Sequence, residues 1–67
     1  MDIREVLYKA WRGGFSTKSA FARYKANEIA ACASMGYIST KVKSHLYGTN
    51  WHITKLGLEV YDECYQD

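Results

Sequence analysis

The chain lacks the features that define several large classes of protein. No apolar run approaches the roughly 20 residues that a membrane-spanning helix needs, so we expect no membrane partner. The first residues, MDIREVLYKA, lack the basic-then-apolar order of a secretory signal, which predicts a cytoplasmic protein. A length of 67 residues leaves room for one domain, residues 1–67, with a modest core.

Motifs for catalysis and metal binding are also missing. The spacing of Cys32, Cys64, His45 and His52 matches neither a C-x-x-C nor an H-x-x-x-H pattern, so we expect no metal site. Cytosolic thiols are usually reduced, which predicts that Cys32 is packed in a helix and that Cys64 lies near a frayed end. No serine, histidine or acid lies in a nucleophile motif, and so small a chain offers no deep pocket. We therefore expect neither enzyme activity nor a cofactor.

Acidic residues are scarce in the middle of the chain. Between Tyr8 and Leu58 there are eight basic residues and a single acid, Glu28, for a net charge of +7. The first seven residues carry −1 and the last nine carry −4, so the whole chain is +2. A basic body with an acidic tail is an asymmetry that points to a charged partner.

Helical spacing of apolar residues predicts a first helix at the start of the chain. Asp2 and Glu5 form a capping-box-like beginning, and Gly13-Gly14 ends the helix because glycine tolerates left-handed backbone geometry. The predicted core face has apolar residues at helical positions, namely Ile3, Val6, Leu7, Ala10 and Trp11.

Two more helices are predicted before residue 36. Ser16 or Thr17 caps a short second helix that ends near Arg23, and a third helix runs from near Lys25 to Met35. The residues expected to face the core are Ala20 and Phe21 in the second helix and Ala26, Ile29, Ala30 and Ala33 in the third. The many alanines of the third helix predict close packing against a neighbour.

After Gly36 the apolar pattern changes from helical spacing to alternation. We predict an antiparallel hairpin with strands at residues 37–43 and 50–54, joined by a turn that has Gly48 at its bend. Thr54 then caps a last helix that carries Leu58 and Tyr61. Three helices, a two-stranded antiparallel wing and a C-terminal helix predict an α+β fold, the winged helix-turn-helix.

One long segment also carries a resemblance to a known family. Its motif consists of Arg23, Ala26, Ile29-Ala30, Ala33-Ser34, Gly36-Tyr37 and Ile38-Ser39, followed by Trp51, Ile53-Thr54 and Gly57. This pattern resembles the small winged-helix-like host-takeover proteins of lytic phages of the T-seven group, over about three-quarters of the chain. The resemblance implies a protein that inhibits host RNA polymerase, notably the form that carries the stationary-phase sigma factor. The acidic end, EVYDECYQD, departs from the family pattern, which finishes basic.

Candidate binding residues gather on the predicted wing. Lys41, Lys43 and His45 occupy alternate positions and are expected to project from one face, where clustered positive charge can contact phosphates. Tyr47 lies beside Gly48 at the predicted bend, where a core role is hard to arrange, so it is a candidate contact residue. The alternative for the lysines is a solvated polar surface that keeps the protein in solution.

The predicted recognition helix offers few side chains that read bases. Arg23 and Lys25 flank its beginning and can contact phosphates. Asn27 can pair with adenine and Lys25 with guanine, whereas Glu28 repels phosphate and Ala31 reads little. We therefore favour host RNA polymerase or its sigma factor as the partner. The alternative is a winged-helix DNA-binding transcriptional regulator, and the sequence indicates no oligomeric state.

The large aromatic residues divide between two expected roles. Trp11, Trp51 and Phe21 are expected in the core, because a short chain needs bulky side chains to bury enough area. The C-terminal tyrosines, with Asp62 and Glu63, predict an acidic-aromatic patch. Such a patch suits a basic protein surface and repels DNA.

Overall fold

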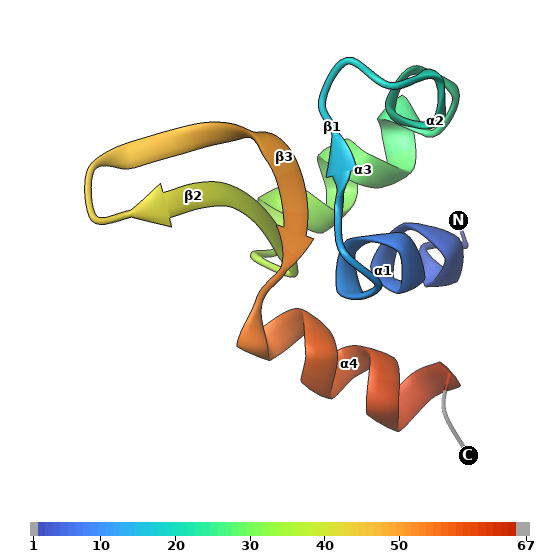
Figure 1. The fold of residues 1–67 in the computed structure, drawn as a ribbon. Coiled ribbons are helices and arrows are strands. Elements are labelled where there is room, and N and C mark those ends of the chain that lie inside the picture. The colour runs from blue at the N-terminus through green and yellow to red at the C-terminus, as the bar shows by residue number, and fades with distance from the viewer. Residues whose placement is uncertain (1, 66–67) are drawn as a thin grey trace.

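The computed structural model describes residues 2–65, in which four helices and three strands surround one core (Figure 1). In chain order the elements are α1 (Arg4–Trp11), β1 (Phe15–Ser16), α2 (Ala20–Tyr24), α3 (Ala26–Ser34), β2 (Ile38–Lys43), β3 (Leu46–Ile53) and α4 (Lys55–Tyr65). The Cα radius of gyration is 11.1 Å, as expected for a small compact α+β domain. The predicted α+β class is confirmed, and Asp67 of the acidic tail lies outside the described residues. No helix within residues 2–65 is long and apolar enough to cross a membrane.

The helix α1 is confirmed, but its capping differs from the prediction. The Asp2 carboxylate accepts a hydrogen bond from the backbone N–H of Arg4 at 3.0 Å, and Ile3 takes the N-cap position without a side-chain bond. The Glu5 carboxylate is therefore free to form an ion pair with Lys25. The helix is followed by Gly14, whose φ of +79° favours glycine and whose position against the carbonyl of Trp51 leaves no room for a Cβ.

A short strand, β1, was not predicted. Phe15 pairs opposite Trp51 of β3, so the sheet is antiparallel with the order β1-β3-β2. Ser16 pairs with β3, and its Oγ accepts a hydrogen bond from the N–H of Lys18 at 3.1 Å, before α2 begins at Ala20. The predicted cap at Ser16 or Thr17 is therefore wrong. Ser19 is the N-cap instead, since its Oγ accepts from the N–H of Ala22 at 3.1 Å.

The helix α3 has the predicted position, but its buried face coincides only in part with the predicted one. Ile29 and Cys32 are buried, whereas Ala26 and Ala30 are exposed. Alanine buries little apolar area, so the larger Ile29 and Cys32 decide which face meets the core. Of the predicted core residues, Ile29 is therefore confirmed and Ala33 is partly buried against the core, whereas the prediction is wrong for Ala26 and Ala30.

The predicted hairpin is confirmed, with a shorter turn. β2 pairs antiparallel with β3, and Lys43 lies opposite Leu46, so the turn consists of residues 44–45 rather than 44–49. His45 closes this turn at a φ of +70°. Gly48 is consequently part of β3, where a Cβ would come within 2.9 Å of the Val42 side chain.

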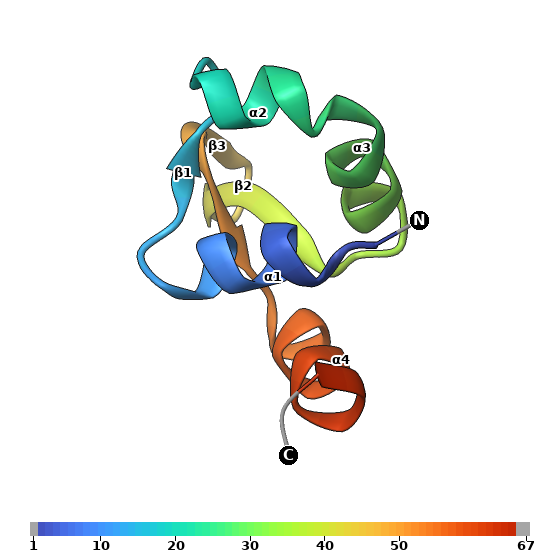
Figure 2. The same ribbon diagram turned by 90° about the vertical axis from the view of Figure 1, so that its right-hand side faces the viewer.

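The start of α4 is fixed to the rest of the domain by Thr54. Its Oγ1 accepts a hydrogen bond from the N–H of Gly57 at 3.0 Å, which confirms the predicted cap. The same hydroxyl lies 2.7 Å from the carbonyl oxygen of Gly36 and 3.0 Å from that of Tyr37. Gly57 is buried against the carbonyl of Tyr37 and has no room for a side chain. This close approach holds α4 beneath α1 (Figure 2).

The core lies between α1, α3 and the sheet. Its buried members are Val6, Leu7, Ala10, Phe15, Ala22, Ile29, Cys32 and Ile38. Trp51 and Phe21 are partly buried and pack against this cluster, as predicted for core residues. Trp11 does not, because 40% of its surface is exposed on the side of α1 that faces α4. The prediction for Trp11 is therefore wrong.

Candidate functional site

The end of the β2–β3 hairpin projects from the body of the domain (Figure 1). Its side chains are exposed from Lys41 through Tyr47. Three of them are apolar or aromatic, and their exposed fractions are 61% for Val42, 52% for Leu46 and 66% for Tyr47. Water disfavours such a concentration of large apolar side chains at one exposed place, which marks the hairpin end as a contact surface.

Strand pairing sets each hairpin lysine beside an apolar residue. Lys41 lies opposite Tyr47, and Lys43 lies opposite Leu46. Directly opposed residues share a face of the sheet, so each pair presents a cation and an apolar side chain together. The register shifts between Ser39 and Lys41 and again between Lys41 and Lys43, so simple alternation along the strand does not hold.

Two predicted positions on the hairpin need correction. His45 does not continue the face of the lysines, because it is in the turn, with positive φ. Tyr47 is not at a bend but in β3, one residue before Gly48. Both side chains are nevertheless exposed, together with Lys41 and Lys43.

The other predicted binding residues lie on α2 and α3, away from the hairpin end. Arg23 and Asn27 are exposed there. The Lys25 ammonium lies 3.4 Å from Glu5 Oε1 and 5.3 Å from the centre of the Tyr24 ring. Lys25 is thus engaged within the domain, whereas neither hairpin lysine has an ion-pair partner in the described part of the chain. The predicted residues therefore form two groups rather than one continuous site.

The exposed face of α3 has few side chains that can bind a base. Its exposed residues are Ala26, Asn27, Ala30 and Ser34. Of these, Asn27 alone has an amide that can pair with a base edge in the manner expected of a reading helix. This face therefore supports specific base reading poorly.

The tyrosines of α4 belong to an aromatic cluster between α1 and α4, and the part that α1 contributes was not predicted from the sequence. The Trp11 and Tyr61 ring centres are 5.8 Å apart, and those of Tyr61 and Tyr65 are 6.0 Å apart. Tyr8 joins them at 6.4 Å from Tyr61. The sequence does contain a signal for this cluster. Tyr8 and Trp11 are three residues apart and Tyr61 and Tyr65 are four apart, so each pair lies on one side of its helix.

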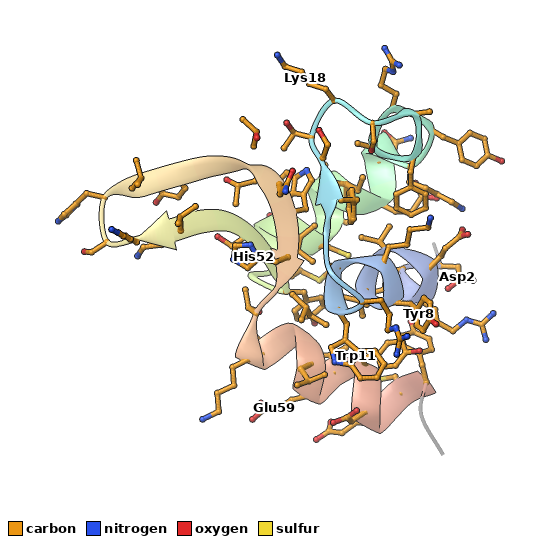
Figure 3. All side chains as sticks on the ribbon, in the orientation of Figure 1. Asp2, Tyr8, Trp11, Lys18, His52 and Glu59 are labelled. Atoms are coloured by element: carbon orange, nitrogen blue, oxygen red, sulfur yellow. The ribbon has the colours of Figure 1, made fainter. Side chains whose placement is uncertain are left out.

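Comparisons with protein-family models, curated proteins and solved structures find no match to this chain. Within residues 2–65, no three histidine, cysteine or acidic side chains gather closely enough to hold a metal ion. Figure 3 shows that the exposed side chains spread over several faces, with the hairpin on one side and Asp2 and Tyr8 on another.

Proposed function

We propose that this domain is a winged helix-turn-helix, with α2 and α3 as the helix pair and the β2–β3 hairpin as the wing. Its element order supports this, because α1, β1, α2 and α3 precede the hairpin, and Lys25 alone separates the two helices. The pairing of β1 with β3 anchors the base of the wing beside α1. The remaining part of the hairpin is then free to meet a partner.

The proposed function is to bind and inhibit host RNA polymerase carrying the stationary-phase sigma factor during phage takeover. The observation that carries this proposal is the exposed apolar-basic wing end, formed by Val42, Leu46 and Tyr47 with Lys41 and Lys43. Aromatic anchors beside cations are typical of protein interfaces, whereas phosphate contacts need the cations alone. The sequence resemblance to phage host-takeover proteins supports the same function.

The test is binding of the purified protein to immobilised host polymerase holoenzyme, together with transcription from a promoter that uses the stationary-phase sigma factor. We expect Leu46→Ser combined with Tyr47→Ser to weaken holoenzyme binding by about tenfold or more, as for interface anchors. Inhibition of transcription should fall in parallel, and the melting temperature should hold because both side chains are exposed.

The chain offers a matched control for this experiment. Leu56 on α4 is 47% exposed and Tyr24 on α2 is 82% exposed, so Leu56→Ser combined with Tyr24→Ser makes the same chemical change elsewhere. This control should bind holoenzyme as the natural protein does. Tight sequence-specific binding to duplex DNA, with no affinity for polymerase or its sigma factors, would overturn the proposal.

A second candidate function is DNA binding by a winged-helix transcriptional regulator. It is favoured by the absence of an ion-pair partner for Lys41 and Lys43 within residues 2–65. The scarcity of base-reading groups on α3 limits this candidate to non-specific contact with the phosphate backbone.

A further inference from the structure

A depression of about 450 Å³ lies between α1 and α4, on a different side of the domain from the hairpin end (Figure 3). Its lining residues are Asp2, Arg4, Glu5, Tyr8, Tyr61 and Tyr65. We call this depression the α1–α4 site. None of its residues belongs to the wing or to α3, so it is independent of the proposed polymerase-binding surface.

Three tyrosine rings form the aromatic part of the α1–α4 site. The ring of Tyr61 lies between those of Tyr8 and Tyr65, at centre distances of 6.4 and 6.0 Å. Tyr8 remains 45% exposed and Tyr65 36% exposed, although they pack against Tyr61. Their ring surfaces are therefore accessible from solvent on the open side of the depression.

Asp2 supplies the unpaired carboxylate of this site. Asp2, Glu5 and Arg4 line the depression, but the Glu5 carboxylate is paired with the Lys25 ammonium at 3.4 Å, whereas Asp2 has no ion-pair partner among the described residues. The carboxylate of Asp2 is close enough to the Tyr65 phenol that, after burial, its charge is the next cause that raises the pKa of Tyr65. The helix α4 also carries three exposed acids that do not line the depression, Glu59, Asp62 and Glu63, and they have no ion-pair partner among the described residues.

We propose that the α1–α4 site binds an arginine or lysine side chain from a basic segment of a protein partner. A cation over the face of an aromatic ring is attracted by the ring quadrupole. A carboxylate at the edge can add a charge-assisted hydrogen bond to the same cation. Asp2 and the three exposed acids of α4 repel the phosphates of nucleic acid, so a protein segment is the occupant that fits. The inference goes beyond the proposed function, since it assigns a second surface.

The first test uses a short glycine-spaced arginine peptide and the same peptide with citrulline, which keeps the shape but removes the charge. Amide resonances of the natural protein are followed by two-dimensional NMR during titration. We expect saturable shifts at Tyr8, Tyr61 and Tyr65 with the arginine peptide and none with the citrulline peptide. Residues 41–47 should not respond.

The second test changes the site. Tyr65→Leu should weaken binding of the arginine peptide by about two- to fivefold, the scale of one exposed cation–aromatic contact. Asp2→Asn should also weaken binding, because it removes the charge that strengthens the hydrogen bond to the guanidinium. Asparagine keeps a side-chain oxygen for the Arg4 N–H, so this change removes charge without removing the cap. Asp2→Glu should restore binding, and Tyr24→Leu, on α2, should leave it unchanged.

Three results of the titration would overturn the inference. The amide shifts could respond equally to the arginine and citrulline peptides, they could be confined to the hairpin, or they could fail to saturate. Concentration-dependent self-association in sedimentation, with shifts at both the hairpin and the α1–α4 site, would mean that a second copy's wing occupies the site instead. Because the peptide assay contains no polymerase, its outcome is separate from the test of the proposed function.

Discussion

At the scale of single residues, the side chain of Thr54 connects two segments that are far apart in the sequence. Its cap on Gly57 was predictable, because threonine before a helical pattern is a common start signal. Its contacts with the carbonyls of Gly36 and Tyr37 were not, since they cross 18 and 17 residues and depend on where α4 docks. Trp11 was misplaced for a related reason, because spacing on α1 does not show that α4 lies beside it.

This connection makes Thr54 a sensitive position. Thr54→Val keeps the shape but leaves the Gly57 N–H without its cap and removes the donor to the two carbonyls, so we expect a loss of ~1–2 kcal/mol in the free energy of unfolding. Thr54→Ser retains the hydroxyl and should lose less. Urea denaturation followed by tryptophan fluorescence measures both. Equal midpoints for Thr54→Val and the natural protein would show that these bonds contribute nothing net.

At the scale of elements, local patterns predicted α1, α3, the hairpin and α4, because each has its own periodicity and stop signal. The strand β1 has two residues and exists through its pairing with β3, so no local pattern could show it. The hairpin turn was predicted too long because Gly48 resembles a turn residue, whereas its role is to make room for Val42. Of the predicted binding residues, those of the hairpin do lie together, while Arg23, Lys25 and Asn27 belong to α2, α3 and the residue between them.

The hairpin lysines give a quantitative test of DNA contact. If Lys41 and Lys43 each contact a phosphate, the double change Lys41→Gln and Lys43→Gln should lower the slope of log affinity against log salt by about 1.8. The loss should be the same for unrelated duplex sequences, because phosphate contacts carry no sequence information. Fluorescence anisotropy with labelled duplexes at several salt concentrations measures this slope. Lys55→Gln, at the start of α4, is the control, and an unchanged slope in the double variant would exclude the wing from DNA contact.

At the scale of the whole molecule, the basic middle of the chain and its acidic last helix contribute to two separate surfaces. The basic, apolar hairpin end projects on one side (Figure 3), and the tyrosine-lined depression that contains Asp2 lies between α1 and α4. The sequence predicts an acidic-aromatic patch from the C-terminal tyrosines and acids alone. Tyr8 and Asp2 could not be predicted as part of it, because they come from the opposite end of the chain and meet α4 only in the folded domain. Which residues share a surface is thus a property of the whole fold.

The same dependence on the whole fold predicts unequal reactivity of the two thiols. Cys64 is exposed, whereas Cys32 is fully buried, and burial, followed by the charge of Glu28, raises the pKa of Cys32 to about 11. A thiol with a raised pKa keeps its proton at mildly alkaline pH, so the reactive thiolate is scarce. We expect a thiol reagent at about pH 8 to modify Cys64 quickly and Cys32 only when the core opens.

Opening of the core can then be measured with Cys64→Ser as the background, in which Cys32 is the only thiol. Leu7→Ala removes a fully buried side chain and should cost ~2–5 kcal/mol. If the core opens as a unit, the reaction of Cys32 should accelerate by about 30-fold or more, since each 1.4 kcal/mol is about tenfold. Leu56→Ala makes the same chemical change at an exposed position and should leave the rate nearly unchanged. If Cys32 reacted as fast as Cys64 in the natural protein, α3 would not be held against α1 as the structure has it.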